Sequence, residues 1–185
     1  MTPTTRYVAF LRAINVGGHV VKMDALRALF ESLGLARVET FIASGNVIFT
    51  SSSKSDRLQT KIEACLHKAL GYEVATFLRT DAEVAAIAQH PAFPAAAIQS
   101  AGAYCVGFVA APLRADAIKK LMSLKTAIDD FHVNGREVYW LCRKKQSDST
   151  FSNNAFERAL GIRATFRGMN TLLKLSAKYP PSAKP

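Results

Sequence analysis

Along the first half of the chain, the spacing of hydrophobic residues is alternately typical of β-strands and of α-helices. Four short apolar and aromatic runs predict strands, at residues 6–11, 38–43, 47–51 and 74–78. Between them, apolar residues recur every three or four positions over residues 23–33 and 58–69, which is typical of helices that bury one face. Gly34 and Gly71 follow these stretches, where a helix commonly ends. The order is strand, helix, strand, strand, helix, strand.

The same order of elements returns in the second half of the chain. Four further runs predict strands, at residues 104–109, 131–133, 138–142 and 164–167. Helical spacing is found over residues 117–122 and 154–160, and Asn134-Gly135 is a two-residue hairpin signal. Thr80 and Glu83 form a capping box that predicts a connecting helix between the halves.

A βαββαβ order is that of the ferredoxin-like split βαβ motif, with helices on one face of an antiparallel sheet. We therefore expect an α+β protein of two tandem ferredoxin-like units with antiparallel sheets and a C-terminal helix. The expected domain organisation is a first unit with its connecting helix, a linker, a second unit with the C-terminal helix and a disordered tail, at residues 1–90, 91–102, 103–178 and 179–185.

A short internal echo accompanies the repeated order. The letters ALG and ATF stand at residues 69–71 and 75–77, and again at residues 159–161 and 164–166. Both copies lie where the second helix of a unit gives way to its last strand. The echo alone is weak support for a repeat, but its place in the repeated order favours duplication.

Several longer motifs resemble a known family. They are LRAINVGG, SGNVIF, NGREVY, NNAFERALG and TFRGMNTLLKL, at residues 11–18, 44–49, 134–139, 153–161 and 165–175. Together they are similar to the bacterial family catalogued as domain of unknown function 1697, and Ala13 stands where that family usually has glycine. The resemblance implies a duplicated α+β fold. It implies no activity, cofactor or ligand.

Charge is the one unusual bulk property of the chain. The formal net charge is +10, with 10 basic and 8 acidic side chains before residue 103 and 14 and 6 from there on, so the halves carry +2 and +8. A basic second half favours an anionic partner, either nucleic acid or a small anionic ligand such as a nucleotide. The alternative is that the charge serves only solubility. The oligomeric state does not follow from the sequence.

The composition also bears on where the protein works. Hydrophobic residues make up 49% and charged residues 21% of the chain, which excludes an intrinsically disordered class. No apolar run is long enough to span a membrane, and the first ten residues lack the features of a secretory signal. We expect a cytoplasmic protein that does not enter membranes.

The first candidate binding segment lies between the first strand and the first helix. Asn15, Gly17 and Gly18 could present backbone N–H groups to a phosphate at the start of that helix, with Arg12 and Lys22 adding positive charge. The segment matches neither GxxxxGK[ST] nor GxGxxG. The alternative is a crossover turn in which the glycines supply positive φ.

The second candidate lies at the last strand and the helix that follows it. Arg167, Asn170, Thr171 and Lys174 are spaced so that a strand end and a helix N-terminus could hold an anion jointly. The alternative is a solvated basic face on which Asn170 or Thr171 caps the helix.

No catalytic or metal-binding arrangement emerges from the motifs. Ser44-Gly45-Asn46 lies between two strands, not in the strand-to-helix context of a nucleophile elbow. The four histidines show no metal-ligand spacing, and three cysteines without CxxC argue against a disulfide framework. We expect no metal and no cofactor, and we expect a binding protein. A small enzyme acting on a phosphorylated or carboxylated metabolite and a protein-interaction module remain the alternatives.

Overall fold

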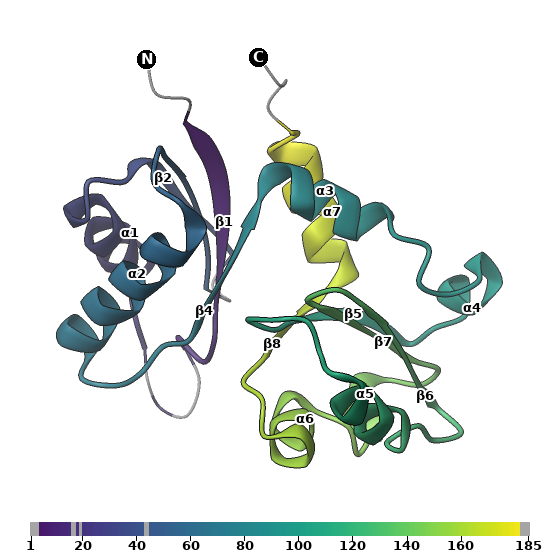
Figure 1. Ribbon diagram of the computed structural model, residues 1–185. Coiled ribbons are helices and arrows are strands. Elements are labelled where there is room, and N and C mark those ends of the chain that lie inside the picture. Colours follow the sequence, from purple (N-terminus) through teal and green to yellow (C-terminus); the bar gives the residue numbers. More distant parts are fainter. Residues whose placement is uncertain (1–3, 16–17, 19, 43–44, 182–185) are drawn as a thin grey trace. The chain divides into compact units, whose positions relative to one another are not determined.

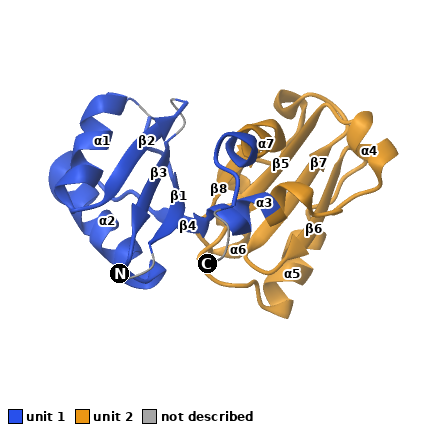
Figure 2. Ribbon diagram, turned by 90° about the horizontal axis from the view of Figure 1, so that it is seen from above, with its two compact units in different colours: residues 1–85, 175–185 blue, residues 86–174 orange. Residues whose placement is uncertain are grey.

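The computed structural model describes residues 4–15, 18, 20–42 and 45–181, and within it the chain divides into two compact units. Unit 1 comprises residues 1–85 and 175–185, and unit 2 comprises residues 86–174 (Figure 2). The boundaries fall inside two helices, α3 (Asp81–Gln89) and α7 (Met169–Lys178). Each unit is described by itself.

Unit 1 contains one four-stranded antiparallel sheet. Its strands and helices, in chain order, are β1 (Thr5–Leu11), α1 (Met23–Ser32), β2 (Ala36–Phe41), β3 (Asn46–Ser51), α2 (Ser55–Leu70) and β4 (Thr76–Thr80). The strands lie side by side in the order β2-β3-β1-β4, with every neighbouring pair antiparallel. Both helices lie against the same face of the sheet (Figure 1). This is the βαββαβ arrangement expected from the sequence.

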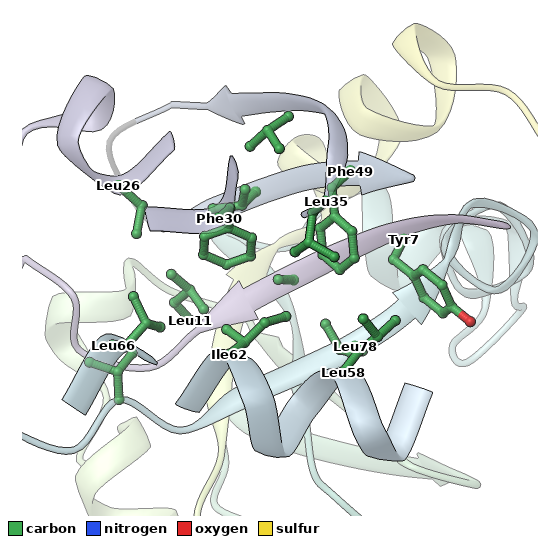
Figure 3. Packing of buried hydrophobic residues seen from close by; sticks show 14 of the residues in the cluster. Tyr7, Leu11, Leu26, Phe30, Leu35, Phe49, Leu58, Ile62, Leu66 and Leu78 are labelled. Atoms are coloured by element: carbon green, nitrogen blue, oxygen red, sulfur yellow. The ribbon is translucent and has the colours of Figure 1, made fainter. Parts of the chain in front are cut away.

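The core of unit 1 lies between the two helices and the sheet (Figure 3). Helix α1 contributes Leu26 and Phe30, and α2 contributes Ile62, all without exposed surface. These residues are spaced three or four apart on their helices, which places them on one stripe. From the sheet, Phe49 stacks on Tyr7 with ring centroids 5.7 Å apart. The helical spacing in the sequence therefore marks the buried face of each helix.

Unit 2 repeats the arrangement with a second four-stranded sheet. Its elements are α4 (Ala95–Gln99), β5 (Ala103–Phe108), α5 (Ala115–Met122), β6 (Asp129–Asn134), β7 (Glu137–Cys142), the 3₁₀ turn η1 (Gln146–Asp148), α6 (Asn153–Leu160) and β8 (Thr165–Gly168). The strand order is β6-β7-β5-β8, again antiparallel throughout. Helices α5 and α6 cover one face of this sheet (Figure 1). The expected fold of two ferredoxin-like units and a C-terminal helix, α7, is confirmed.

The central strands of both sheets are buried along almost their whole length. Residues 7–11 of β1 and all six residues of β7 are buried, although their side chains alternate between the two faces. Strands with two covered faces read as continuous apolar runs rather than alternating ones. This explains why the runs at residues 7–11 and 138–142 show no polar interruption.

Strand register shows how the two units correspond. Arg79 pairs with the central residue Val8, and Arg167 pairs with Val106, so the two arginines occupy matching places. The repeated ATF letters, at residues 75–77 and 164–166, do not occupy matching places in the two sheets. Phe166 packs in the helix-covered core of its sheet, whereas Leu78 takes that role in unit 1 and the adjacent residue 77 points to the other face. The duplication is structural, and the ATF letters coincide out of register.

The structure confirms one local expectation and differs from two others. The capping box of Thr80 and Glu83 forms, with each backbone N–H donating to the other's side chain at 2.7 and 3.1 Å. The segment expected as a linker contains α4. Tyr179, placed in the expected tail, is buried, and its hydroxyl donates to Glu39 Oε2 at 2.7 Å. None of the helices described is both long and apolar enough to cross a membrane.

The close approach at Gly107 yields a stability prediction. A Cβ at Gly107 would lie 2.5 Å from Phe166 Cζ, inside a packed ring cluster, so Gly107→Ala forces the ring to move. We expect a loss of about 1–3 kcal/mol in the free energy of unfolding, measured by urea denaturation. Gly168→Ala, which meets open space, should stay within about 0.5 kcal/mol of wild type.

A second variant distinguishes the clash with the Phe166 ring from a general destabilisation of strand β5. In a Phe166→Leu background the ring is gone, so Gly107→Ala should cost clearly less than it does alone. Equal costs in both backgrounds would contradict the packing explanation.

Candidate functional site

Between β1 and α1, the Asn15 side chain is held by a backbone group of the same segment. Asn15 Oδ1 accepts a hydrogen bond from the Val21 backbone N–H at 2.7 Å, so its amide oxygen serves the turn. Arg12 is half-buried, and Lys22 is exposed at the cap of α1 without a side-chain hydrogen bond to the helix. Gly17 lies outside the described residues.

Positive φ angles mark the same turn. Gly18 has a φ of 88° and open space around it, and Ala13 has a φ of 57°. The left-handed region favours glycine, which agrees with the family resemblance at position 13. Gly45, in the hairpin between β2 and β3, has a φ of 77°, and a Cβ there would lie 2.5 Å from Ile14 Cγ2. These features support the turn interpretation of both glycine motifs.

Arg167 does not lie on an exposed basic face. It is only 8% exposed, and its Nη1 donates to Thr165 Oγ1 at 2.7 Å and to the Phe166 carbonyl at 3.0 Å. Burial lowers the pKa of Arg167 to about 10, which still leaves the guanidinium charged near neutral pH. The burial of Arg167 therefore disagrees with the alternative of a solvated basic face, and joint anion binding with Asn170, Thr171 and Lys174 stays a prediction.

The other residues of the C-terminal candidate are more accessible. Asn170 and Lys174 are exposed, and Thr171 is half-buried, all on α7. Asn170 lines a cavity of unit 2, and Arg167 is not among the residues that line it. The structure thus places Asn170 at a cavity that Arg167 does not reach.

Unit 1 contains a cleft of about 470 Å³ that the sequence analysis did not single out. Three segments and Thr4 line it: the segments are the turn from α1 into β2, the end of β3 with the serines that follow it, and the first two turns of α2. Arg57 and Lys61 stand on its α2 wall. A second hollow of about 510 Å³ shares Ser52, Ser53 and Arg57 with the cleft and adds Lys54 and Asp56. We call the two hollows together the anion cleft.

The cations of the anion cleft have no acidic partner. Neither the Arg57 nor the Lys61 side chain forms an ion pair or hydrogen bond within the part of the chain that the structure describes. By contrast, Arg27 on α1 lies 3.2 Å from Asp24. The acidic residue at the rim of the anion cleft is Asp56, whose Oδ1 accepts a hydrogen bond from the Ser55 hydroxyl at 3.4 Å.

Helix α2 begins without a side-chain cap. Ser55 is its first helical residue, and Lys54 stands at the N-cap with no side-chain hydrogen bond to the helix. The first N–H groups of α2 are thus left for solvent or a ligand. In unit 2, Ser152 caps α6 by accepting from the Ala155 N–H at 3.1 Å.

The cavity in unit 2 has a volume of about 680 Å³ and a different character. Its walls come from the end of α3, α4, the start of β5 and the first turns of α7, all within residues 88–173. Apolar residues such as Phe93, Ile98 and Met169 predominate. The polar groups are His90, Tyr104, Cys105, Asn170 and two glutamines.

Three titratable side chains of unit 2 have contacts within the protein. Asp129 is buried and accepts hydrogen bonds from Trp140 Nε1 and Ser149 Oγ, each at 2.8 Å. His90 and His132 place their Nε2 atoms 3.1 Å apart. Among the described residues no group of three or more His, Cys, Asp or Glu side chains could hold a metal ion.

Sequence signals for these hollows differ in strength. The run SSSKS at residues 51–55, followed by Arg57 and Lys61 one helical turn apart, is a detectable basic, hydroxyl-rich helix start. The cavity of unit 2 has no such signal, because apolar residues and single polar side chains from distant segments line it.

The structure defines a class: a protein of two ferredoxin-like units, with a cleft lined by serines and basic side chains in unit 1 and a largely apolar cavity in unit 2. The chain belongs to DUF1697, a family of proteins of unknown function, whose model matches residues 4–139. Among solved structures it is similar to the conserved bacterial protein SP0830 from Streptococcus pneumoniae, at 25% identity and a TM-score of 0.74, covering 95% of this chain and 98% of that one. No curated protein matched.

The buried thiols yield a reactivity prediction. Cys105 and Cys142 are buried and free, and burial raises the pKa of Cys105 to about 11. Because the thiolate is the reactive form, only about one Cys105 side chain in a thousand is ionised at pH 8. We expect half-buried Cys65 to alkylate first in the native protein, with Cys105 about 100-fold slower, measured by iodoacetamide pulses and mass spectrometry.

Unfolding provides the control for this prediction. In denaturant all three thiols should react at similar rates, since burial is the cause of the difference. Native labelling of Cys105 as fast as Cys65, or a Cys105–Cys142 disulfide in freshly isolated protein, would contradict it.

Proposed function

We propose that this protein binds a small phosphate-bearing ligand, a nucleotide in the first place, in the anion cleft of unit 1, without converting it chemically. The observation that carries the proposal is the pair Arg57 and Lys61, two cations without an acidic partner in the described chain, facing one cleft with serine hydroxyls. Arginine and lysine are the side chains that proteins use most for phosphate.

The spacing of the two cations supports an anionic occupant. Residues four apart on a helix are surface neighbours, and like charges there cost about 0.2–0.5 kcal/mol. Arg57 and Lys61 carry that cost, and neither side chain forms an ion pair with a carboxylate of the described residues, Asp56 at the rim included. A phosphate between them would neutralise the repulsion and accept hydrogen bonds from both.

The start of α2 adds to the same preference. The partial positive charge of a helix N-terminus attracts anions, and the first N–H groups of α2 have no side-chain cap. Ser51 Oγ already accepts from the Ser53 backbone N–H at 3.1 Å, so its O–H can be turned toward a ligand. Charge, dipole and hydroxyls thus favour the same kind of ligand.

The remaining walls favour a nucleotide over a free inorganic ion. Leu33, Leu35 and Leu58 line the cleft beside the two cations. A volume of about 470 Å³ lies in the range of small-molecule sites. A phosphate at Arg57 and Lys61 would leave the leucine-lined part of the cleft free for an organic group attached to that phosphate. A nucleic-acid duplex would instead need an extended basic surface.

The lining supports binding more than catalysis. The residues that line the anion cleft include no histidine and no cysteine, and the rim carboxylate of Asp56 lies on an exposed helix turn. General acid–base chemistry near neutral pH usually employs a positioned group of perturbed pKa. An enzyme acting on a phosphorylated metabolite is the less supported reading.

Substitution of the two cations tests the proposal. Arg57→Gln with Lys61→Gln removes both charges while keeping long polar side chains, so the fold should be unaffected. We expect adenosine monophosphate to bind at least about tenfold more weakly, since each lost charged hydrogen bond is worth about 1.5–3 kcal/mol before solvent screening. Isothermal titration calorimetry at about 50 mM salt measures this.

The matched control removes two charges elsewhere. Lys119→Gln with Lys120→Gln neutralises two exposed lysines of α5, which do not line the anion cleft, and should leave the affinity unchanged. If this control loses binding while the cleft variant keeps it, the ligand is held by the basic second half. Adenosine should bind more weakly than its monophosphate, and no detectable binding of the monophosphate would remove the proposal.

A further inference from the structure

The cavity of unit 2 differs from the anion cleft in the chemistry of its walls. All the residues that line it lie within residues 88–173 of the described chain, and none of them is Asp, Glu, Lys or Arg. An occupant held there gains no ion pair, and a charged one would lose hydration without compensation. The cavity therefore favours a neutral molecule.

Aromatic side chains shape one wall of the cavity. The rings of Phe93 and Tyr104 meet edge to face, with centroids 5.9 Å apart and an interplanar angle of 76°. His90 adds a third ring to the wall, and its own ring lies 5.1 Å from that of Tyr139. Rings of this kind bind flat apolar or heteroaromatic molecules through edge and face contacts.

The wall is held in place by polar contacts behind it. His90 Nε2 lies 3.1 Å from His132 Nε2 on β6, and the Tyr139 hydroxyl donates to the Ile87 carbonyl at 3.2 Å. These contacts join the end of α3 to the sheet. The wall is thus preorganised, which lowers the entropic cost of binding.

Tyr104 supplies the polar group that would orient an occupant. Its hydroxyl is buried and has no hydrogen-bond partner among the described groups. Buried polar atoms are almost always paired, so an unpaired one calls for a partner such as a water molecule or a ligand. Burial also raises the pKa of Tyr104, so the phenol stays protonated and can donate.

We propose that unit 2 carries a second binding site, for a small uncharged aromatic or heteroaromatic molecule whose carbonyl oxygen accepts a hydrogen bond from the Tyr104 hydroxyl. The walls select against charge, the rings accept a flat molecule, and Tyr104 fixes its orientation. The site shares no residue with the anion cleft, so the two sites can be tested separately.

Binding of neutral probes is the first test. Benzamide has a ring with a carbonyl acceptor, toluene has the ring alone, and benzoate replaces the amide by a charge. In ¹H–¹⁵N spectra of the full chain, we expect benzamide in the millimolar range to shift the amides of residues 101–105 and 170. Benzoate should bind there at least about fivefold more weakly. No shifts at these amides with benzamide, or tighter binding of benzoate, would overturn the proposal.

Removal of one hydroxyl is the second test. Tyr104→Phe keeps the ring and deletes the donor, so benzamide should bind about 3- to 10-fold more weakly while toluene is unaffected. Equal benzamide affinity in wild type and variant would show that Tyr104 does not hold the carbonyl. Equal losses for both probes would show that the variant has altered the cavity itself, and would equally overturn the assigned hydrogen bond.

Two further variants separate this site from the anion cleft. Ala101→Trp places a large side chain at the cavity wall and should abolish the benzamide shifts, while binding of adenosine monophosphate persists. Arg57→Gln with Lys61→Gln should leave the benzamide shifts intact. Loss of benzamide binding in this second variant would show that benzamide reports on the anion cleft, which would refute the proposed site.

Discussion

Burial of both faces of the central strands is the constraint on which the rest of this structure depends. Because β1 and β7 have almost no exposed residue, a polar side chain buried in these sheets has no access to bulk water and depends on partners inside the protein. Asn46 donates to the Phe41 carbonyl, and Arg167 donates to Thr165 and the carbonyl of residue 166. Groups that could meet a ligand are thereby found at helix starts, in turns and at strand ends, such as Ser51 of β3 and Tyr104 of β5.

The same constraint explains which parts of the fold the sequence could predict. Unbroken apolar runs at residues 7–11 and 138–142 are what doubly covered strands require, and helical spacing marked the stripes of α1 and α2. Capping was harder to predict. Several serines and asparagines stand near the start of α2 and of α6, and the sequence does not show that Lys54 and Ser152 take the N-cap position. Helix α4 was missed because its alanine-rich stretch has prolines before it and few apolar anchors.

The candidate sites were less predictable, for a geometric reason. Glycine motifs are visible in a sequence, but they mark backbone turns as readily as ligand loops, and here Asn15 and Gly45 serve the backbone. A basic run shows charge but not exposure, so the burial of Arg167 could not be foreseen. The anion cleft and the cavity of unit 2 are instead lined by segments tens of residues apart in the sequence. Only the basic start of α2 can be recognised from a short stretch of sequence.

Duplication gives the anion cleft an internal comparison. Counted from the first helical residue, Arg57 and Lys61 of α2 stand at the third and seventh positions, which Ala155 and Ala159 occupy in α6. The start of α6 is also capped by Ser152, whereas that of α2 is not. A helix that needs only to cover its sheet can use the alanines and the cap, as α6 does. The two cations and the open N-terminus of α2 add nothing to packing, so an anion outside the fold accounts for them better than the fold itself.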